Sequence, residues 1–185
     1  EKKRQILKKI SSINVPELEP EYSIIKAASK KANYDKNNIK IKLINQDARI
    51  AVKTISKKFS TIILDGFSPS QNPELYSLEF LSLLKERLKQ SGVILCHSQN
   101  PIFRSALKEI SFKIANLEQG TIASLTKDFQ LEEKDEKLIR AFRPFHDPLL
   151  KWSGEKIIKE WKKPLGLQTL HLYKTPVKKL IASNL

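Results

Sequence analysis

The stretch from Thr61 to Tyr76 constrains this chain more than any other, because an apolar run leads directly into an acidic residue and a rigid loop. Thr61 to Leu64 are β-prone and show no polar alternation, which is typical of a parallel strand buried on both faces. Ligands of such sheets bind beyond the carboxyl ends of the strands, so Asp65 is predicted to stand at a functional site. Gly66 permits a sharp turn there, and two prolines stiffen the loop that follows.

The bulk composition agrees with a folded α/β domain. The chain has 185 residues, 40% of them hydrophobic, which suits one domain with a substantial core. Helix-period and strand-like stretches alternate along most of it, which favours an α/β fold. No apolar run approaches the roughly 20 residues of a membrane-spanning helix, so we expect no membrane partner. The single cysteine, Cys96, excludes an internal disulfide and fits a reducing, cytoplasmic location.

The chain is strongly basic, with 34 Lys and Arg against 20 Asp and Glu and a net charge of +14. Basic surfaces gain affinity for nucleic acid by neutralising phosphates and releasing counterions. A lysine-rich solvated surface gives the same composition without any such partner. The charge alone leaves both interpretations open.

Strands and helices are predicted to alternate on both sides of the central stretch. We expect strands at 12–15, 39–44, 61–64, 93–96, 112–117 and 121–124, and helices at 22–31, 49–57, 78–90 and 102–110. Ser77 is the predicted N-cap of the helix at 78–90, and Gly92 is its predicted C-terminal glycine. Residues 1–126 are expected to form the main domain. Residues 127–185 are expected to form a basic C-terminal extension packed on or beside it.

Acidic residues recur at three successive predicted strand ends, which are Glu17 and Glu19, Asp47, and Asp65. In a doubly wound sheet these ends lie side by side along one edge. The first acids can then accept hydrogen bonds from ribose hydroxyls, and Asp47 can accept from an adenine amino group. Asp65 would lie nearest to a transferred group. The alternative is that each acid only caps the helix that follows it.

Other catalytic patterns are weak. The absence of a Gly-x-Gly-x-x-Gly motif and of a P-loop argues against a nucleotide triphosphatase. The three histidines, His97, His146 and His171, lack metal-ligand spacing with Cys96, so we expect no metal. His97 follows a predicted strand and can face the cleft, although a hydrogen-bonded structural role is the alternative.

The segment Leu64-Asp-Gly-Phe-Ser-Pro-Ser-Gln-Asn-Pro-Glu-Leu-Tyr76 resembles the signature loop of MnmC-type S-adenosylmethionine-dependent methyltransferases. Those enzymes complete the 5-methylaminomethyl group on the wobble uridine of tRNA. The resemblance covers about residues 39–124. It implies a class I, Rossmann-like fold, with a mostly parallel sheet and an antiparallel last strand. It also implies S-adenosyl-L-methionine as the cofactor and tRNA as the partner, in the stand-alone form without an oxidase domain.

The resemblance also assigns roles to the acidic residues. Asp65 is expected in the active site, near the amine that receives the methyl group. Asp47 and Ala48 are expected on the adenine side of the cofactor, and Glu17 or Glu19 on the ribose side.

The signature loop is expected to bind the substrate through Phe67, Asn72, Pro73 and Tyr76. Phe67 and Tyr76 can stack on an exposed uridine, because RNA readers favour bases splayed out of the stack. Ordinary packing within the loop is the alternative for both rings.

The chain departs from the family pattern in two places. Tyr76 replaces the usual tryptophan, and the glycine-rich turn after the first strand is absent, so we expect a fragment that can be inactive by itself. Two other functions remain open. One is a spermidine-synthase-like aminopropyl transferase, although a chain of charge +14 would repel its cationic substrate. The other is a non-catalytic RNA-binding module on a degenerate methyltransferase fold.

Overall fold

The structure is a computed structural model that describes residues 19–163. The predicted strand at 12–15 and Glu17 lie outside the described residues, and Glu19 is the first residue of a helix. The chain divides between Gln46 and Asp47 into two compact units. The composition change predicted at residue 127 falls within the second unit.

The first unit contains helix α2 (Glu19–Lys31) and a hairpin of β1 (Asn33–Lys36) and β2 (Ile39–Lys42). The predicted helix at 22–31 is confirmed. The strand expected at 39–44 forms, but its expected place beside the central strand is wrong, because β2 pairs antiparallel with β1. The physical reason is the turn between them. Asn37 and Asn38 both have positive φ, 51° and 63°, as a tight two-residue hairpin turn requires.

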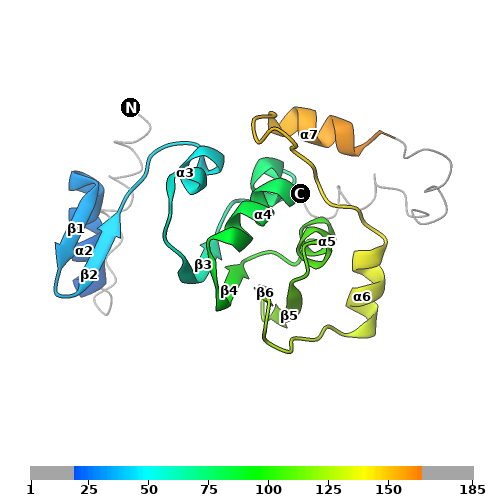
Figure 1. Cartoon of the computed structure of the whole chain (residues 1–185), viewed down its shortest axis with the longest axis horizontal. Coiled ribbons are helices and arrows are strands. Elements are labelled where there is room, and N and C mark those ends of the chain that lie inside the picture. The colour runs from blue at the N-terminus through cyan, green and yellow to red at the C-terminus, as the bar shows by residue number, and fades with distance from the viewer. Residues whose placement is uncertain (1–18, 164–185) are drawn as a thin grey trace. The chain divides into compact units, whose positions relative to one another are not determined.

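The second unit is built on one mixed sheet. Its strands are β3 (Phe59–Leu64), β4 (Leu88–Cys96), β5 (Lys113–Leu117) and β6 (Gly120–Ser124). Its helices are α3 (Ala48–Thr54), the 3₁₀ helix η2 (Pro73–Tyr76), α4 (Leu78–Glu86), α5 (Pro101–Glu109), α6 (Glu133–Arg140) and α7 (Gly154–Trp161) (Figure 1). The strand order is β3-β4-β6-β5.

Strand directions in this sheet match the expected fold. β3 and β4 are parallel, whereas β6 is antiparallel to both β4 and β5. Three of the four strands therefore point the same way, and β6, the last in the chain, points the other way. The expectation of a mostly parallel sheet with an antiparallel last strand is confirmed.

The two faces of this sheet differ in burial. On β3, Leu64 is 7% exposed and its neighbour Ile63 is 73% exposed. On β4, Ile94 is buried and Leu95 is half-buried. The expectation of a central strand buried on both faces is therefore wrong: within residues 19–163, β3 is an edge strand, and the described helices bury only the face that carries Leu64.

Helix α4 covers the buried face and begins as expected. The hydroxyl of Ser77 accepts a hydrogen bond from the Phe80 backbone N–H, and Phe80, Leu81 and Leu84 enter the core. The predicted extension of this helix to residue 90 is wrong, because Leu88 already begins β4. Gly92 lies inside β4 rather than after the helix. A Cβ at Gly92 would meet the Leu88 side chain at 2.8 Å.

Helix α5 packs beside α4 on the same face (Figure 1). Asn100 caps it by accepting from the Ile102 N–H, and Pro101 occupies its first turn, where no intrahelical donor is needed. Phe103 and Leu107 are 0% exposed. The predicted helix at 102–110 and the predicted pairing of the last two strands are confirmed.

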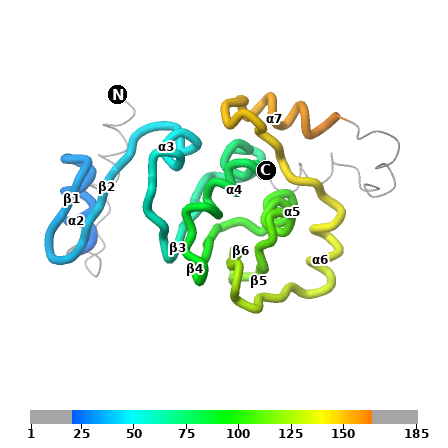
Figure 2. Tube along the Cα trace, in the orientation of Figure 1, coloured from blue at the N-terminus to red at the C-terminus, as the bar shows by residue number. Residues whose placement is uncertain are grey.

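After β6 the chain runs through a loop to α6 and returns to α7 (Figure 2). Ile139, Phe145 and Ile157 from this segment join the hydrophobic core of the sheet and its helices. The rings of Phe145 and Trp161 meet edge to face with centroids 5.6 Å apart. Residues 127–163 therefore share one core with the sheet.

Candidate active site at the strand ends

The carboxyl ends of β3 and β4 open into a hollow. The two strands end side by side, with Leu64 paired to Cys96, so Asp65 and His97 directly follow neighbouring strand ends. Both residues line an open hollow of about 890 Å³. This volume lies in the range of small-molecule and cofactor sites.

The lining of the hollow combines apolar walls with a few polar groups. The apolar side chains include Ile63, Leu95 and Leu117, and the polar ones are Asp65, His97, Glu118 and Gln119. His97 Nε2 lies 3.3 Å from Gln119 Oε1. His97 therefore combines the two roles considered for it, since it lines the hollow and is hydrogen-bonded.

Gly120 brings β6 very close to the end of β4. A Cβ at this position would lie 2.4 Å from the Cys96 carbonyl oxygen, a distance that no side chain can occupy. The first residue of β6 therefore fixes the wall of the hollow next to His97, and only glycine allows that approach.

Arg104, on α5, holds the β5–β6 turn from behind. Its Nε donates to Thr121 Oγ1 at 2.8 Å, and its Nη2 donates to Asn116 Oδ1 at 2.8 Å. Burial lowers the pKa of Arg104, and Asp135 partly opposes that effect. Arg104 is not among the residues predicted from the sequence; its signal there is an arginine on the apolar stripe of α5, beside Phe103.

The signature loop splits into buried and exposed parts. Tyr76 is 0% exposed, its hydroxyl donates to the Gly66 carbonyl at 3.0 Å, and its ring meets Phe103 edge to face. Pro73 is also buried, and Asn72 Nδ2 donates to Glu74 Oε1 at 3.3 Å. Loop packing thus accounts for Tyr76 and Pro73, because an enclosed ring has no face on which a base can stack.

Phe67 is the exposed member of this loop. Its side chain is 84% exposed, although it is large and apolar. Phe67 follows Asp65 by only two residues, and Asp65 lines the hollow. An aromatic ring in this position is available for contact with a ligand.

Two neutral groups lie behind Asp65. Burial raises the pKa of the Tyr76 hydroxyl above its ordinary value. Burial likewise raises the pKa of the Cys96 thiol to about 11. Both groups are therefore protonated at neutral pH.

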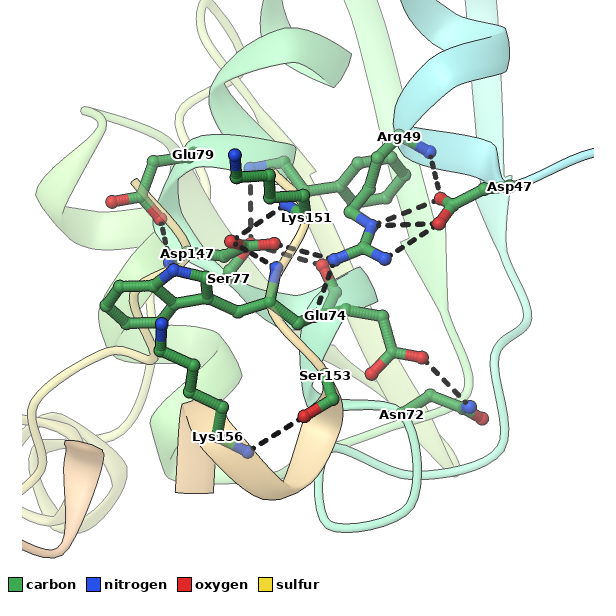
Figure 3. Close-up of polar contacts among 12 residues, drawn as sticks. Asp47, Arg49, Asn72, Glu74, Ser77, Glu79, Asp147, Lys151, Ser153 and Lys156 are labelled. Carbon is green, nitrogen blue, oxygen red and sulfur yellow. Dashed lines mark hydrogen bonds and ion pairs between the residues drawn. The ribbon is translucent and has the colours of Figure 1, made fainter. Parts of the chain in front are cut away.

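Asp47 is the N-cap of α3, and its carboxylate pairs with the side chain of Arg49 (Figure 3). Its carboxylate caps the helix by accepting from the Arg49 N–H at 2.9 Å, and Arg49 Nη2 donates to Oδ2 at 2.7 Å. These hydrogen bonds lower the pKa of Asp47 and raise that of Arg49. The structure thus shows the capping alternative for Asp47. Its side chain is still 39% exposed, and its role toward a cofactor stays a prediction.

Arg49 also reaches the C-terminal segment. Its Nη1 donates to Asp147 Oδ2 at 2.7 Å and to the Trp152 carbonyl at 2.8 Å (Figure 3). Asp147 is 0% exposed and also accepts from the backbone N–H groups of Lys151 and Trp152. This buried carboxylate ties the loop before α7 to the helix that Asp47 begins.

Glu79 links α4 to the segment that contains Asp147. Its Oε1 lies 3.0 Å from His146 Nδ1, and its Oε2 accepts from the Asp147 backbone N–H at 2.7 Å. The hydrogen bond with Glu79 raises the pKa of His146. Burial opposes ionisation of Glu79, but the hydrogen bonds from His146 and Asp147 outweigh it and lower the Glu79 pKa.

The described residues form neither a metal site nor a membrane-spanning helix. Across residues 19–163 no group of three or more His, Cys, Asp or Glu side chains is arranged to hold a metal ion. Among the helices of the same residues, none has both the length and the apolarity needed to cross a bilayer.

Comparison with known proteins gives matches of three different kinds. The sequence profile of the S-adenosyl-L-methionine-dependent methyltransferase family matches residues 12–121. An uncharacterized protein of Methanocaldococcus jannaschii, MJ0670, is 30% identical over 142 residues, which are 70% of this chain and 39% of that protein. The crystal structure of MNMC2 from Aquifex aeolicus matches 76% of this chain and 48% of that chain, with 29% identity and a TM-score of 0.68. The chain thus spans less than half the length of either relative.

Proposed function

Because this chain belongs to the family of S-adenosyl-L-methionine-dependent methyltransferases, we propose that it methylates the amine of 5-aminomethyl-(2-thio)uridine at the tRNA wobble position. The resemblance to MnmC-type methyltransferases, the Rossmann-like α/β fold and the cofactor class are confirmed by the family match and the likeness to the Aquifex aeolicus structure. The choice of substrate is the proposal.

The observation that carries this proposal is the pairing of an exposed carboxylate with an exposed aromatic ring at the strand ends. Asp65 lines the hollow, and Phe67 stands 84% exposed two residues later. A carboxylate can accept a hydrogen bond from an amine, and an exposed aromatic ring can stack on a base that has left the base stack. A basic chain, with its net charge of +14, suits a substrate carried on RNA.

The residues present fit the cofactor in size and charge. The hollow of about 890 Å³ is large enough for a nucleoside-sized ligand, and the exposed carboxylates of Asp65 and Glu118 on its wall suit a cationic group. Asp47 and Ala48 are proposed to hold the adenine, since the Asp47 side chain keeps 39% of its surface exposed. When bound, the cofactor supplies a methyl group on a positively charged sulfur.

The protein's own contribution is to position the amine and manage its proton. Asp65 is proposed to orient the neutral amine and to receive the proton that the nitrogen loses after it gains the new bond. Ile63, Leu95 and Leu117 line the hollow beside it and are proposed to displace water from the nitrogen lone pair when the substrate is bound. Positioning and desolvation then account for most of the rate, because no covalent catalysis is needed. Phe67 is proposed to stack on the uracil ring.

The test uses the full chain with tRNA that lacks the final methyl group. We expect calorimetric binding of S-adenosyl-L-methionine and transfer of labelled methyl to that tRNA, but not to fully modified tRNA. Asp65→Asn should reduce methyl transfer at least tenfold without lowering the thermal midpoint. The control Asp128→Asn, at an exposed position, should leave methyl transfer unchanged. Full activity of Asp65→Asn would overturn its role. Binding of tRNA without binding of the cofactor would point instead to the non-catalytic RNA-binding alternative.

A further inference from the structure

We infer that the outward face of α7 is the surface that holds the phosphate backbone of the RNA substrate beside the signature loop. This inference rests on the proposed function, because it assumes that the substrate is carried on RNA. The α7 basic face consists of two exposed lysines on the helix, Lys156 and Lys159, together with the exposed lysines next to its ends, which are Lys151, Lys162 and Lys163.

The amphipathic pattern of α7 turns these lysines outward. Ser153 caps the helix by accepting from the Lys156 N–H, and Ile157 is 0% exposed in the core. Lys156 and Lys159 are spaced i, i+3 within α7 on the side away from Ile157, and Lys163 follows directly after the C-cap Lys162, whose backbone is still in the αR region. The stripe spans about 10 Å at 1.5 Å per residue.

The positive charge of this face is only partly neutralised. The helix carries two acids, Glu155 and Glu160, and Glu160 is already paired with Lys163 at 2.6 Å. In the described part of the chain, the other four lysines form no ion pair within 4.0 Å of a carboxylate. Lys156 instead lies 4.3 Å from the centroid of the Trp152 ring, and this cation–π contact holds its ammonium group at the surface.

The α7 basic face is anchored to the signature loop. Helix α7 packs on η2, the turn formed by Pro73–Tyr76. A Cβ at Gly154 would lie 3.1 Å from the Pro73 ring, so the first turn of α7 sits directly against that loop. An RNA held along α7 is thereby held next to the loop that also carries Phe67.

The form of this surface indicates a polyanion rather than a small ligand. Its ammonium groups are exposed point charges on the surface of the helix and of the residues next to it. A nucleic-acid strand carries one negative charge every few ångströms, so a stripe of about 10 Å can contact more than one phosphate. Each phosphate contact adds affinity that decreases with salt concentration.

The test measures the binding of a fluorescein-labelled, unmodified tRNA transcript by anisotropy between 50 and 300 mM KCl. The variant Lys156→Gln/Lys159→Gln/Lys163→Gln removes three charges from the α7 basic face. The matched control, Lys57→Gln/Lys58→Gln/Lys89→Gln, removes three exposed charges around the amino ends of β3 and β4, away from the strand-end site. We expect the α7 variant to bind on the order of tenfold more weakly at low salt. We also expect its salt slope to fall by about two to three.

The control variant should lose less affinity than the α7 variant. Equal losses in both variants, or unchanged binding by the α7 variant, would overturn the inference. Thermal midpoints identify any variant that fails to fold. In that case the measurement is repeated with the single change Lys159→Gln, which breaks no ion pair and is expected to give about a third of the effect.

A methyl-transfer assay separates this inference from the proposed function. If tRNA binding depends on α7 but no tRNA accepts a methyl group, the proposed function fails and the α7 surface stands. If methyl transfer occurs while the α7 variant binds tRNA as tightly as the wild type, the α7 inference alone fails.

Discussion

Arg49 Nη1 and Asp147 Oδ2 are 2.7 Å apart, although the two residues are 98 positions apart in the chain. The side chain of Asp147 is 0% exposed and that of Arg49 is 11% exposed. The pair therefore joins α3 to the C-terminal segment at a place from which water is largely excluded. Removing either partner leaves a charge there without its full compensation.

Asp147→Ala is expected to destabilise the protein by about 3 kcal/mol, because it removes one partner of a buried ion pair. It also leaves the backbone N–H groups of Lys151 and Trp152 without their acceptor. Denaturant unfolding measures the change. Asp128→Ala is the control, since its pair with Lys113 is 79% and 50% exposed and should contribute less than about 1 kcal/mol. Similar losses in the two variants would contradict a buried role for Asp147.

The pair formed by His146 and Glu79 predicts a pH-dependent stability. Hydrogen bonding to Glu79 raises the pKa of His146, so its contribution is complete below the ordinary value of 6.5 and is lost as the pH rises through the folded value. The pKa of Glu79 is lowered, so its contribution is complete above 4.5 and is lost as the pH falls. The pair therefore stabilises most between about pH 4.5 and 6.5.

His146→Gln should flatten the decrease of the thermal midpoint between pH 6 and 8 relative to the wild type. The exposed Lys137→Gln, at the Lys137–Glu133 surface pair, should leave the shape of that curve unchanged. A His146→Gln profile that still parallels the wild type would show that another group causes the pH dependence.

Gly120→Ala is expected to cost about 1–3 kcal/mol, because its Cβ would lie 2.4 Å from the backbone oxygen of Cys96 and the strands must move apart. Gly66→Ala is the matched substitution in the signature loop. Its Cβ would lie 3.1 Å from the Leu75 side chain, which can rotate away, so we expect a change below about 1 kcal/mol. Thermal unfolding compares the two. A Gly120→Ala variant as stable as the wild type would contradict the close approach of β6 to β4.

Phe67→Ala separates activity from stability. Because the ring is 84% exposed, its removal should change the free energy of unfolding by no more than about 0.5 kcal/mol. Loss of stacking on the uracil ring, about 1–3 kcal/mol per base, should lower kcat/KM for tRNA by roughly 5- to 150-fold. Leu149→Ala, which truncates another exposed apolar side chain, should leave kcat/KM unchanged. Equal activities of the two variants would remove Phe67 from the substrate site.

Local signals in the sequence were sufficient to predict most of the second unit. The apolar run before Asp65, the Ser77 cap and the alternation of strands with helices placed β3, the start of α4, α5 and the last two strands correctly. Asp65 was placed at a strand end by the same reasoning, and the structure adds the hollow that it lines. These features depend on neighbouring residues, which the sequence shows directly.

The features that were missed depend on distant contacts or on backbone angles. The strand at 39–44 was assigned to the wrong sheet because the positive φ angles of Asn37 and Asn38, which close a hairpin, outweigh its strand pattern. Gly92 resembles the end of a helix but lies inside β4, where its carbonyl accepts a hydrogen bond from the Ser124 hydroxyl at 3.2 Å. Asp147 has no local signal, because its side-chain partner Arg49 lies 98 positions away, and the position of Arg104 on the apolar stripe of α5 indicates burial but not its partners.

The long separation between Arg49 and Asp147 also has a consequence for the order of biosynthesis. A ribosome that adds about 5–20 residues per second needs roughly 5–20 s to extend the chain by the 98 positions between them. Throughout that interval the nascent chain carries Asp47 and Arg49 with each other as partners, while the buried acceptor for Arg49 does not yet exist. The second unit can therefore close around its ion pair only after Asp147 has been made, which places this contact among the later ones to form during synthesis.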